Sequence, residues 1–246
     1  MYFPTVGSTN DIAAEIAAAG AAEGVVVLAD RQTSGRGRRG RSWFSPASSG
    51  LYVSIVLRPA RAEVDPARAT ALLTLAAGVA LAEAIEDASG LRVELKWPND
   101  LYIGRRKVGG ILAETAGGAP GSTVVLGYGI NVGAAAFPPE LGDHATSLES
   151  ALGRPVDRTP VLVESLAAMG RRYGDLLDGR YDAILDAWRA RAPASIGARV
   201  AWSTLTGRQS GITRGIDEHG ALLVQSDSRL ERIVAGELTW EHAPSD

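Results

Sequence analysis

The spacing of hydrophobic and polar positions predicts helices and short strands through residue 191. Apolar residues that recur every three or four positions behind a capping residue predict helices at 8–19, 68–88, 159–178 and 181–191. Short runs rich in β-branched and aliphatic residues predict strands at 25–29, 51–57, 92–97, 101–103, 108–115 and 124–132. The runs between 92 and 115 follow one another without intervening helices, which favours an antiparallel or mixed sheet.

Beyond Pro193 the pattern changes to short alternating segments separated by turns that contain Gly, Asp and Ser. Strands are expected at 196–203, 207–216, 221–225 and 232–240, with a turn at 217–220. A stretch of about 50 residues with this pattern predicts a small β-barrel of the SH3-like kind. The sequence therefore predicts an α+β protein with two domains, at 1–193 and 194–246.

Composition narrows the class of protein. The chain has 246 residues, a formal net charge of −3 and 46% hydrophobic residues, which fits one large domain, alone or with a small second one. The absence of cysteine excludes a disulfide framework, a thiolate metal site and a cysteine nucleophile, and it suits a reducing cytosol. His144, His219 and His242 lack metal-ligand spacing, which disfavours both triad hydrolysis and metal-centred hydrolysis. If the protein binds a metal, the sequence leaves its ligands unknown. No apolar run approaches the roughly 18 residues of a membrane span, and no signal peptide is visible, so we expect a cytoplasmic protein without a membrane partner.

The basic residues are almost all arginine. Of the 25 basic residues 23 are Arg, and the two lysines are Lys96 and Lys107. Lysine is a compact point charge and arginine a planar fork, so a site that needs a point charge cannot exchange one for the other. The scarcity of lysine makes each remaining one a candidate functional residue, with chance as the alternative.

Arginine and glycine alternate in the segment 35–43, GRGRRGRSW. Seven arginines and no acidic residue lie between Arg31 and Ala62, although the chain is net acidic. Glycine gives backbone freedom, and arginine supplies paired donors for phosphate and carboxylate oxygens. The segment either grips a nucleic acid backbone or closes as a loop over a polyphosphate in an enzyme, with a solvated charge run as the structural alternative. Neither a Walker A sequence nor a dinucleotide-binding glycine motif is present, which disfavours the standard phosphate-binding folds.

Three further motifs each have a structural and a functional interpretation. Lys96 ends a predicted strand, where its ammonium either faces water or points into a cleft to neutralise a carboxylate that meets a phosphate. Gly127 and Gly129 lie within a predicted strand, which indicates either a bulge or a group that approaches the backbone closely. The segment Ser8–Asn10 either caps a helix or binds polar ligand groups at its N-terminus.

Five of these motifs occur in a fixed order along the chain. They are STN at 8–10, Gln32 followed by GRGRRGRSW at 35–43, KWPND at 96–100, KVGGILAE at 107–114 and GYGIN at 127–131. In this combination the chain resembles the biotin protein ligases over nearly its whole length. The resemblance implies a catalytic domain related to class II aminoacyl-tRNA synthetases, followed by an SH3-like domain. Because the chain opens directly ahead of the STN motif, it also implies a monofunctional form that lacks the N-terminal DNA-binding domain and has no sequence-specific nucleic acid partner.

The resemblance assigns roles to individual residues. The implied biotin-binding residues are Ser8, Thr9, Asn10, Gln32, Gly35, Arg36, Gly37, Arg38, Lys96, Leu101, Gly127 and Ile130. The implied ATP-binding residues are Arg36, Arg38, Arg39, Arg41, Trp43, Lys96 and Asn131. Lys96, Arg36 and Arg38 are the implied catalytic residues.

The implied reaction has two steps. Biotin attacks the α-phosphate of ATP to give biotinyl-5'-AMP, and the biotinyl group then passes to a lysine on the biotin carboxyl carrier domain of acetyl-CoA carboxylase or a related carboxylase. ATP and biotin are the implied substrates and Mg²⁺ the implied metal. A lipoate or octanoyl ligase is the nearest alternative, and a nucleic-acid-binding module is the alternative of a different class. The sequence does not decide the oligomeric state, and a homodimer stays open.

Overall fold

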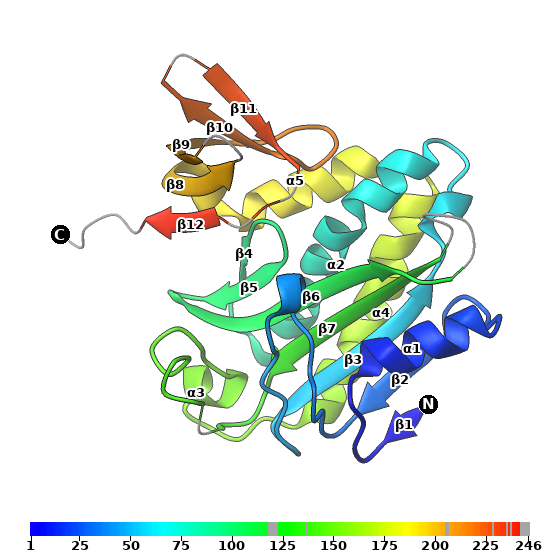
Figure 1. Cartoon of the computed structure of the whole chain (residues 1–246). Helices are drawn as coiled ribbons and strands as arrows, with labels where there is room; N and C mark the ends of the chain where they lie inside the picture. The colour runs from blue at the N-terminus through cyan, green and yellow to red at the C-terminus, as the bar shows by residue number, and fades with distance from the viewer. Residues whose placement is uncertain are drawn as a thin grey trace.

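A seven-stranded sheet forms the centre of the larger part of the protein (Figure 1). The computed structural model describes residues 1–117, 123–135, 137–204, 207–227, 229–234, 236 and 238–241. The strands are β1 (Tyr2–Phe3), β2 (Val26–Ala29), β3 (Gly50–Leu57), β4 (Glu94–Lys96), β5 (Asp100–Ile103), β6 (Arg106–Thr115) and β7 (Val124–Asn131). Their order is β1-β2-β3-β7-β6-β5-β4, and only the β1–β2 pair is parallel. The expected mixed sheet of an α+β protein is confirmed.

Helices cover the two faces of this sheet unequally. On β3, Leu51, Val53 and Ile55 belong to the large core that includes α2 (Pro66–Ser89) and α4 (Arg158–Leu177). The alternate residue Val56 packs instead with α1 (Thr9–Ala18) on the opposite face. Figure 1 shows α1 in front of the sheet and α2 and α4 behind it. The face that carries only the short helix α1 has room for a cavity.

Helix α2 is the central helix of the core. Asp65 caps it by accepting a 2.9 Å hydrogen bond from the amide of Arg68, and Gly90 ends it in a left-handed conformation with φ 76°. Among the described residues one helix, α2, is long and apolar enough to span a bilayer, with a mean hydropathy of 1.5 over its most apolar window. Polar residues interrupt this window, so no uninterrupted apolar run marks it in the sequence. Because 72% of the window is buried inside the protein, α2 has the character of a core helix.

The C-terminal part forms a second, five-stranded antiparallel sheet. Its strands are β8 (Ile196–Thr204), β9 (Gly207–Ile216), β10 (Leu222–Ser226), β11 (Arg229–Ile233) and β12 (Leu238–Glu241), in the order β11-β10-β9-β8-β12. The β9–β10 turn docks on the larger part, since Gly220 lies against Leu72 and Leu75 of α2. Trp97 Nε1 donates a buried 2.9 Å hydrogen bond to the carbonyl of Gly220. The residue after Lys96 is therefore tied directly to the C-terminal sheet.

Most of the expected elements are present, with three differences. Helix α5 (Tyr181–Arg191) and strand β9 have the expected ends. The strand expected at 232–240 is wrong, because that region holds parts of two strands, β11 and β12, which belong to opposite edges of the second sheet. Strand β1 and the helix α3 (Leu148–Leu152) were not expected, since elements of two and five residues are too short to show a period.

Candidate active site

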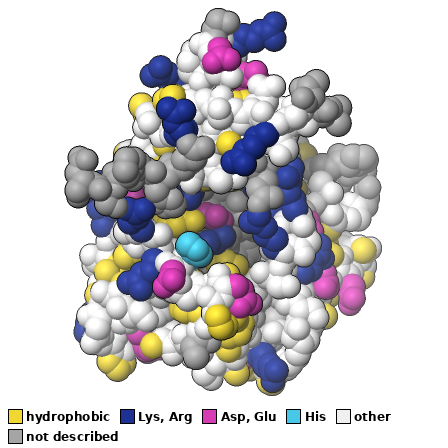
Figure 2. All heavy atoms as spheres, turned by 60° about the vertical axis from the view of Figure 1, so that its left-hand side comes forward, with side chains coloured by type: hydrophobic (Ala, Val, Ile, Leu, Met, Phe, Trp, Pro, Cys, Tyr) yellow, Lys and Arg dark blue, Asp and Glu magenta, His cyan; other side chains and the backbone are white. Residues whose placement is uncertain are grey.

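A cavity of about 400 Å³ opens on the α1 face of the large sheet. It lies between the N-terminus of α1, the segment 36–44, the strands β4 to β7, the loop 137–145 and strand β12. Figure 2 shows the hollow with Lys and Arg side chains gathered around and inside it. The motifs at 8–10, 35–43, 96–100, 107–114 and 127–131 all contribute lining residues.

Buried polar side chains form one end of the cavity. Gln32 Oε1 accepts hydrogen bonds from the amide and the hydroxyl of Thr9 at 2.8 and 3.0 Å, and Gln32 Nε2 donates to Ser45 Oγ at 2.9 Å. Ser54 Oγ donates to Asn10 Oδ1 at 2.6 Å. Ser8 occupies the N-cap position of α1, as the capping interpretation expects, but its side chain makes no cap hydrogen bond. The preorganised polar corner suits a ligand that carries its own donors and acceptors.

The glycines of β7 allow side chains to lie directly on the sheet. A Cβ atom on Gly127 would be 2.0 Å from Asn10 Oδ1, and one on Gly129 would be 2.3 Å from Trp43 Nε1. Of the two interpretations of a glycine within this strand, close approach therefore holds, and the approaching groups are the protein's own Asn10 and Trp43. The Trp43 indole nitrogen is buried with no hydrogen-bond partner among the described residues.

The Arg/Gly segment is a short hairpin. Arg36 and Ser42 form an antiparallel bridge, and the amide of Gly37 donates to the carbonyl of Arg41 at 2.7 Å. The tip is a 3₁₀ turn at 38–40 in which Arg39 has φ 57°. Arg38, Arg39 and Arg41 line the cavity. The hairpin therefore places several guanidinium groups on one wall.

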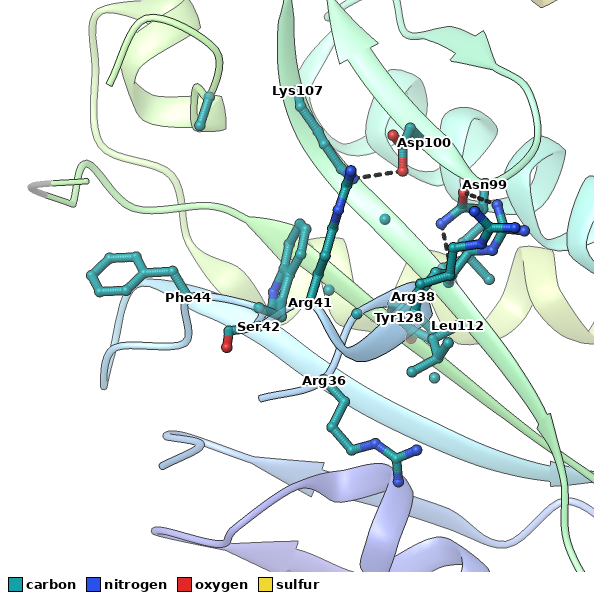
Figure 3. Close-up of a pocket in the computed structure, with 18 of the residues that line it drawn as sticks. Arg36, Arg38, Arg41, Ser42, Phe44, Asn99, Asp100, Lys107, Leu112 and Tyr128 are labelled. Carbon is teal, nitrogen blue, oxygen red and sulfur yellow. Dashed lines mark hydrogen bonds and ion pairs between the residues drawn. The ribbon is translucent and has the colours of Figure 1, made fainter. Parts of the chain in front are cut away.

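Two of these arginines differ in their partners. Arg36 pairs with both Asp11 on α1 and Glu114 on β6, and the hydrogen bond with Asp11, followed by the charge of Glu114, raises its pKa. Figure 3 shows the Arg36 side chain pointing away from Arg38 and Lys107. Arg38 donates to Asn99 Oδ1 at 3.2 Å, and burial lowers the pKa of its guanidinium. Arg38 is thus held in the cavity, whereas Arg36 is held by carboxylates at its edge.

Both lysines of the chain line the cavity. Lys107 Nζ donates to Asp100 Oδ1 at 2.6 Å (Figure 3). The same ammonium lies 5.4 Å from the centroid of the Trp43 ring. Lys96 is half-buried, and burial lowers the pKa of its ammonium. The sequence assigned no role to Lys107, although the scarcity of lysine had marked it as a candidate.

Three residues expected at the site do not line the cavity. Leu101 and Ile130 are fully buried in the large core, on the face of the sheet that α2 and α4 cover. Successive residues of a strand face opposite sides, so Ile130 cannot share the face of Gly127 and Gly129. Gly35 lies at the base of the hairpin, where a Cβ would be 2.4 Å from the Trp43 carbonyl oxygen, so its role is to allow that packing.

The remaining expected residues do line the cavity. They are Ser8, Thr9, Asn10, Gln32, Arg36, Gly37, Arg38, Arg39, Arg41, Trp43, Lys96, Gly127 and Asn131. Asn131 also donates from Nδ2 to the carbonyl of Thr146 at 3.0 Å. Lining residues that the sequence did not single out include Tyr102, Phe44, Phe137 and, from the C-terminal sheet, Trp240. These aromatic residues lie in ordinary hydrophobic patterns, so no local signal distinguishes them from core residues.

The comparisons with known proteins give the family. The model described as "Biotin/lipoate A/B protein ligase family" matches residues 2–131, and that described as "Biotin protein ligase C terminal domain" matches residues 196–238. The biotin–[acetyl-CoA-carboxylase] ligase of Paracoccus denitrificans is 36% identical over 94% of this chain and 96% of that protein. The bifunctional ligase/repressor BirA of Bacillus subtilis is 37% identical over 97% of this chain and 73% of that protein.

A solved structure supports the same relationship. The biotin protein ligase from Aquifex aeolicus in complex with biotin and ATP aligns with a TM-score of 0.84 and 29% identity, covering 99% of this chain and 98% of that one. The fold is that of a protein ligase, and the chain belongs to the biotin/lipoate A/B protein ligase family. The Paracoccus denitrificans protein and the Aquifex aeolicus protein, which this chain matches over nearly their whole length, are both named as biotin ligases.

Proposed function

We propose that this chain is a biotin protein ligase, which activates biotin with ATP and transfers it to a lysine of a biotin carboxyl carrier domain. The observation on which the proposal rests is the meeting of three elements in one cavity: the polar corner at Thr9 and Gln32, the arginine hairpin, and both lysines. The 36% identity to a named biotin–[acetyl-CoA-carboxylase] ligase over almost the whole chain also supports it.

In the first step two anions must react. A carboxylate oxygen of biotin attacks the α-phosphorus of ATP, the bond to the bridging oxygen breaks, and pyrophosphate leaves with its electron pair. Arg38 and Lys96 line the cavity where these groups would meet, and their charges offset the repulsion and stabilise the negative charge that develops on the phosphoryl oxygens. Holding both substrates in one enclosed site supplies the orientation that the attack needs.

In the second step the activated biotin reacts with an amine. The uncharged ε-amine of the acceptor lysine attacks the acyl carbon of biotinyl-5'-AMP, an amide bond forms, and AMP leaves while the new amide nitrogen loses a proton. The polar corner would hold the ureido ring of biotin through Ser8, Thr9 and Gln32. The Trp43 ring, which lies on β7 beside Lys107, would pack near the adenine.

Mg²⁺ is proposed to enter with ATP. No group of three potential ligands from His, Cys, Asp and Glu occurs within the described ranges. Magnesium is usually held by one or two carboxylates together with substrate phosphates, so the cavity carboxylate Asp100 and the triphosphate are a suitable donor set. The ion would supply charge neutralisation on the phosphates.

The finer architecture is also a proposal. We infer a catalytic domain at 1–193, with the sheet of the class II aminoacyl-tRNA synthetases, and an SH3-like barrel at 194–246. The separate second sheet, which begins at β8 after α5 has ended, supports this division. A cytoplasmic location, the absence of nucleic acid and membrane partners, and the homodimer remain predictions.

The test is a transfer assay. Purified protein is incubated with ATP, Mg²⁺, radiolabelled biotin and a biotin carboxyl carrier domain, and label is counted on that domain. We expect labelling that requires ATP and is lost when the acceptor lysine is replaced by arginine. Labelling by lipoate in place of biotin would instead identify the lipoate ligase alternative, and filter binding at low salt tests the nucleic-acid alternative.

A further inference from the structure

The Lys96 ammonium lies between two aromatic rings that belong to different sheets. Lys96 Nζ is 4.8 Å from the ring centroid of Tyr102 on β5 and 5.3 Å from that of Trp240 on β12. All three side chains line the cavity. Both distances are within the roughly 6 Å over which the face of an aromatic ring attracts a cation.

Lys96 differs in this respect from the other cations of the site. Lys107 pairs with Asp100, and Arg36 pairs with two carboxylates. Among the residues that the structure describes, none forms an ion pair with Lys96. An ion pair must be broken or shared when a phosphate binds, whereas a ring contact leaves the full charge available. The two rings can therefore hold Lys96 in place without neutralising it.

The charges around Lys96 have opposite effects on the pKa of its ammonium. Burial lowers the pKa of its ammonium, the charge of Asp100 acts to raise it, and that of Lys107 lowers it again. The arginines of the hairpin line the same cavity. Because burial and neighbouring cations disfavour the charged form, the attraction of the ring faces contributes to keeping Lys96 protonated.

The C-terminal sheet is attached to the residue that directly follows Lys96. Trp97, the next residue, donates its buried indole hydrogen bond to the carbonyl of Gly220 in the β9–β10 turn. Strand β12 pairs with β8, with Trp240 opposite Val200. The Trp240 ring is thus held by the sheet that also anchors the end of the strand from which Lys96 projects.

We propose that Trp240, together with Tyr102, is a positioning residue for Lys96 in the adenylation step. The proposal rests on the proposed function, since Lys96 acts in that step. The ring from the C-terminal sheet confines the ammonium to the side of the cavity where the carboxylate and the α-phosphate meet. The C-terminal sheet is then part of the adenylation site and does more than attach to it.

Three variants separate the contribution of the ring from that of general packing. Trp240→Leu keeps an apolar cover but removes the aromatic face, Trp240→Phe keeps a ring, and Thr239→Ala changes an exposed neighbour on the same strand as a control.

For Trp240→Leu we expect kcat of biotin-dependent ATP/pyrophosphate exchange to fall roughly 5- to 30-fold, the range that a partly desolvated cation–π contact gives. KM for biotin should change less, and Trp240→Phe should recover most of kcat. In a Lys96→Ala background, Trp240→Leu should have little further effect, because the residue through which it acts is gone.

A second measurement does not depend on turnover. With only two lysines in the chain, competitive acetylation followed by mass spectrometry gives the pKa of Lys96, with Lys107 as the internal reference. We expect the Lys96 pKa to be lower in Trp240→Leu than in the wild type and Trp240→Phe. If the Lys96 pKa responds in this way while even the wild-type protein forms no biotinyl-5'-AMP, the proposed function fails and the ring contact stands. An unchanged or raised Lys96 pKa in Trp240→Leu, or an equal loss of kcat in Trp240→Phe, overturns the proposal.

Discussion

The Trp43 indole lies on the backbone of Gly129, so closely that a methyl group on Gly129 would be 2.3 Å from the indole nitrogen. Gly129→Ala must therefore move the Trp43 ring, which lines the cavity beside Lys107. A misplacement of about 1 Å can cost on the order of 100-fold in rate. We expect kcat/KM for ATP to fall by roughly 10- to 100-fold, measured by ATP/pyrophosphate exchange.

A glycine elsewhere provides the matched control. Gly170 lies on an exposed face of α4 with nothing within 4 Å of a Cβ atom. Gly170→Ala should leave exchange unchanged and stabilise the protein by about 0.5–1 kcal/mol in urea unfolding, since alanine is the better helix former. If Gly129→Ala exchanged as fast as Gly170→Ala, the Trp43 ring would have no role in the reaction.

Substitution of Lys96 tests the central charge of the adenylation step. Lys96→Ala should lower the rate of biotin-dependent ATP/pyrophosphate exchange by roughly 100- to 1000-fold, the cost of removing one stabilising donor, while thermal unfolding stays cooperative. Lys96→Arg should also be poor, because a planar fork does not replace a point charge held between two rings. Unimpaired exchange in Lys96→Ala would falsify the role of this residue.

The pH dependence follows from the lowered pKa of Lys96. The charged ammonium is the active form, and a lowered pKa means that the charge is lost earlier as the pH rises. The rate of adenylation should therefore decline on the alkaline side with a midpoint below 10.5, the ordinary value for lysine. In Lys96→Arg the decline should move to higher pH, because the guanidinium stays charged. A pH–rate profile of the exchange reaction checks this, and a midpoint that is the same in both proteins would assign the decline to another group.

Because Arg36 is paired with two carboxylates, weakening either ion pair should increase the affinity for ATP. If Arg36 leaves Asp11 and Glu114 to reach a phosphate, the ion pairs oppose nucleotide binding. Asp11→Asn removes one half-exposed pair, worth up to about 1 kcal/mol, so ATP should bind up to roughly 5-fold more tightly by calorimetry. Asp186→Asn, which removes the exposed pair with Arg189 on α5, is the control. Weaker ATP binding in Asp11→Asn would mean that the paired position of Arg36 is the binding position.

Asp217, in the β9–β10 turn, should make the stability of the protein depend on pH in the acid range. Burial acts to raise the pKa of its carboxyl, but hydrogen bonds from Arg232 and from the amides of Ala221 and His219 together hold that pKa below the ordinary value of 3.8. A lowered carboxyl pKa gives stability that is present above about pH 4 and is lost as the pH falls through the folded-state value. Asp217→Asn should cost roughly 0.5–1 kcal/mol at pH 7 and less at pH 3, by urea unfolding. An equal cost at both values would exclude the charge as the cause.

Much of the fold follows from local patterns. Helix α5 and strand β9 have the expected ends because their periods, caps and flanking turns all agree. The large sheet was expected to be mixed because its strands form a meander. The division of 232–240 between two strands could not be predicted, since β11 and β12 are separated by pairing with different partners, β10 and β8, at a distance in the chain.

The sequence motifs predicted which segments form the site, but they did not predict how the side chains are arranged in it. Motif order located most of the lining residues, but it ignored strand alternation, which puts Ile130 on the buried face while Gly129 faces the cavity. The partners of Arg36 lie 25 and 78 residues away, and no local pattern links them. The meeting of Lys96 and Trp240 depends on how the second sheet packs, which composition and spacing do not specify.

The location of both lysines in the cavity has a consequence for self-modification. An activated biotinyl group that escapes into solvent can acylate any accessible ε-amine, but both lysines of this sequence line the cavity. Autobiotinylation of the lysines of this sequence is thereby restricted to two positions in the site. Because the lysines of this sequence do not lie on its exterior, the lysine of the acceptor domain is the main ε-amine with which the reactive intermediate can combine.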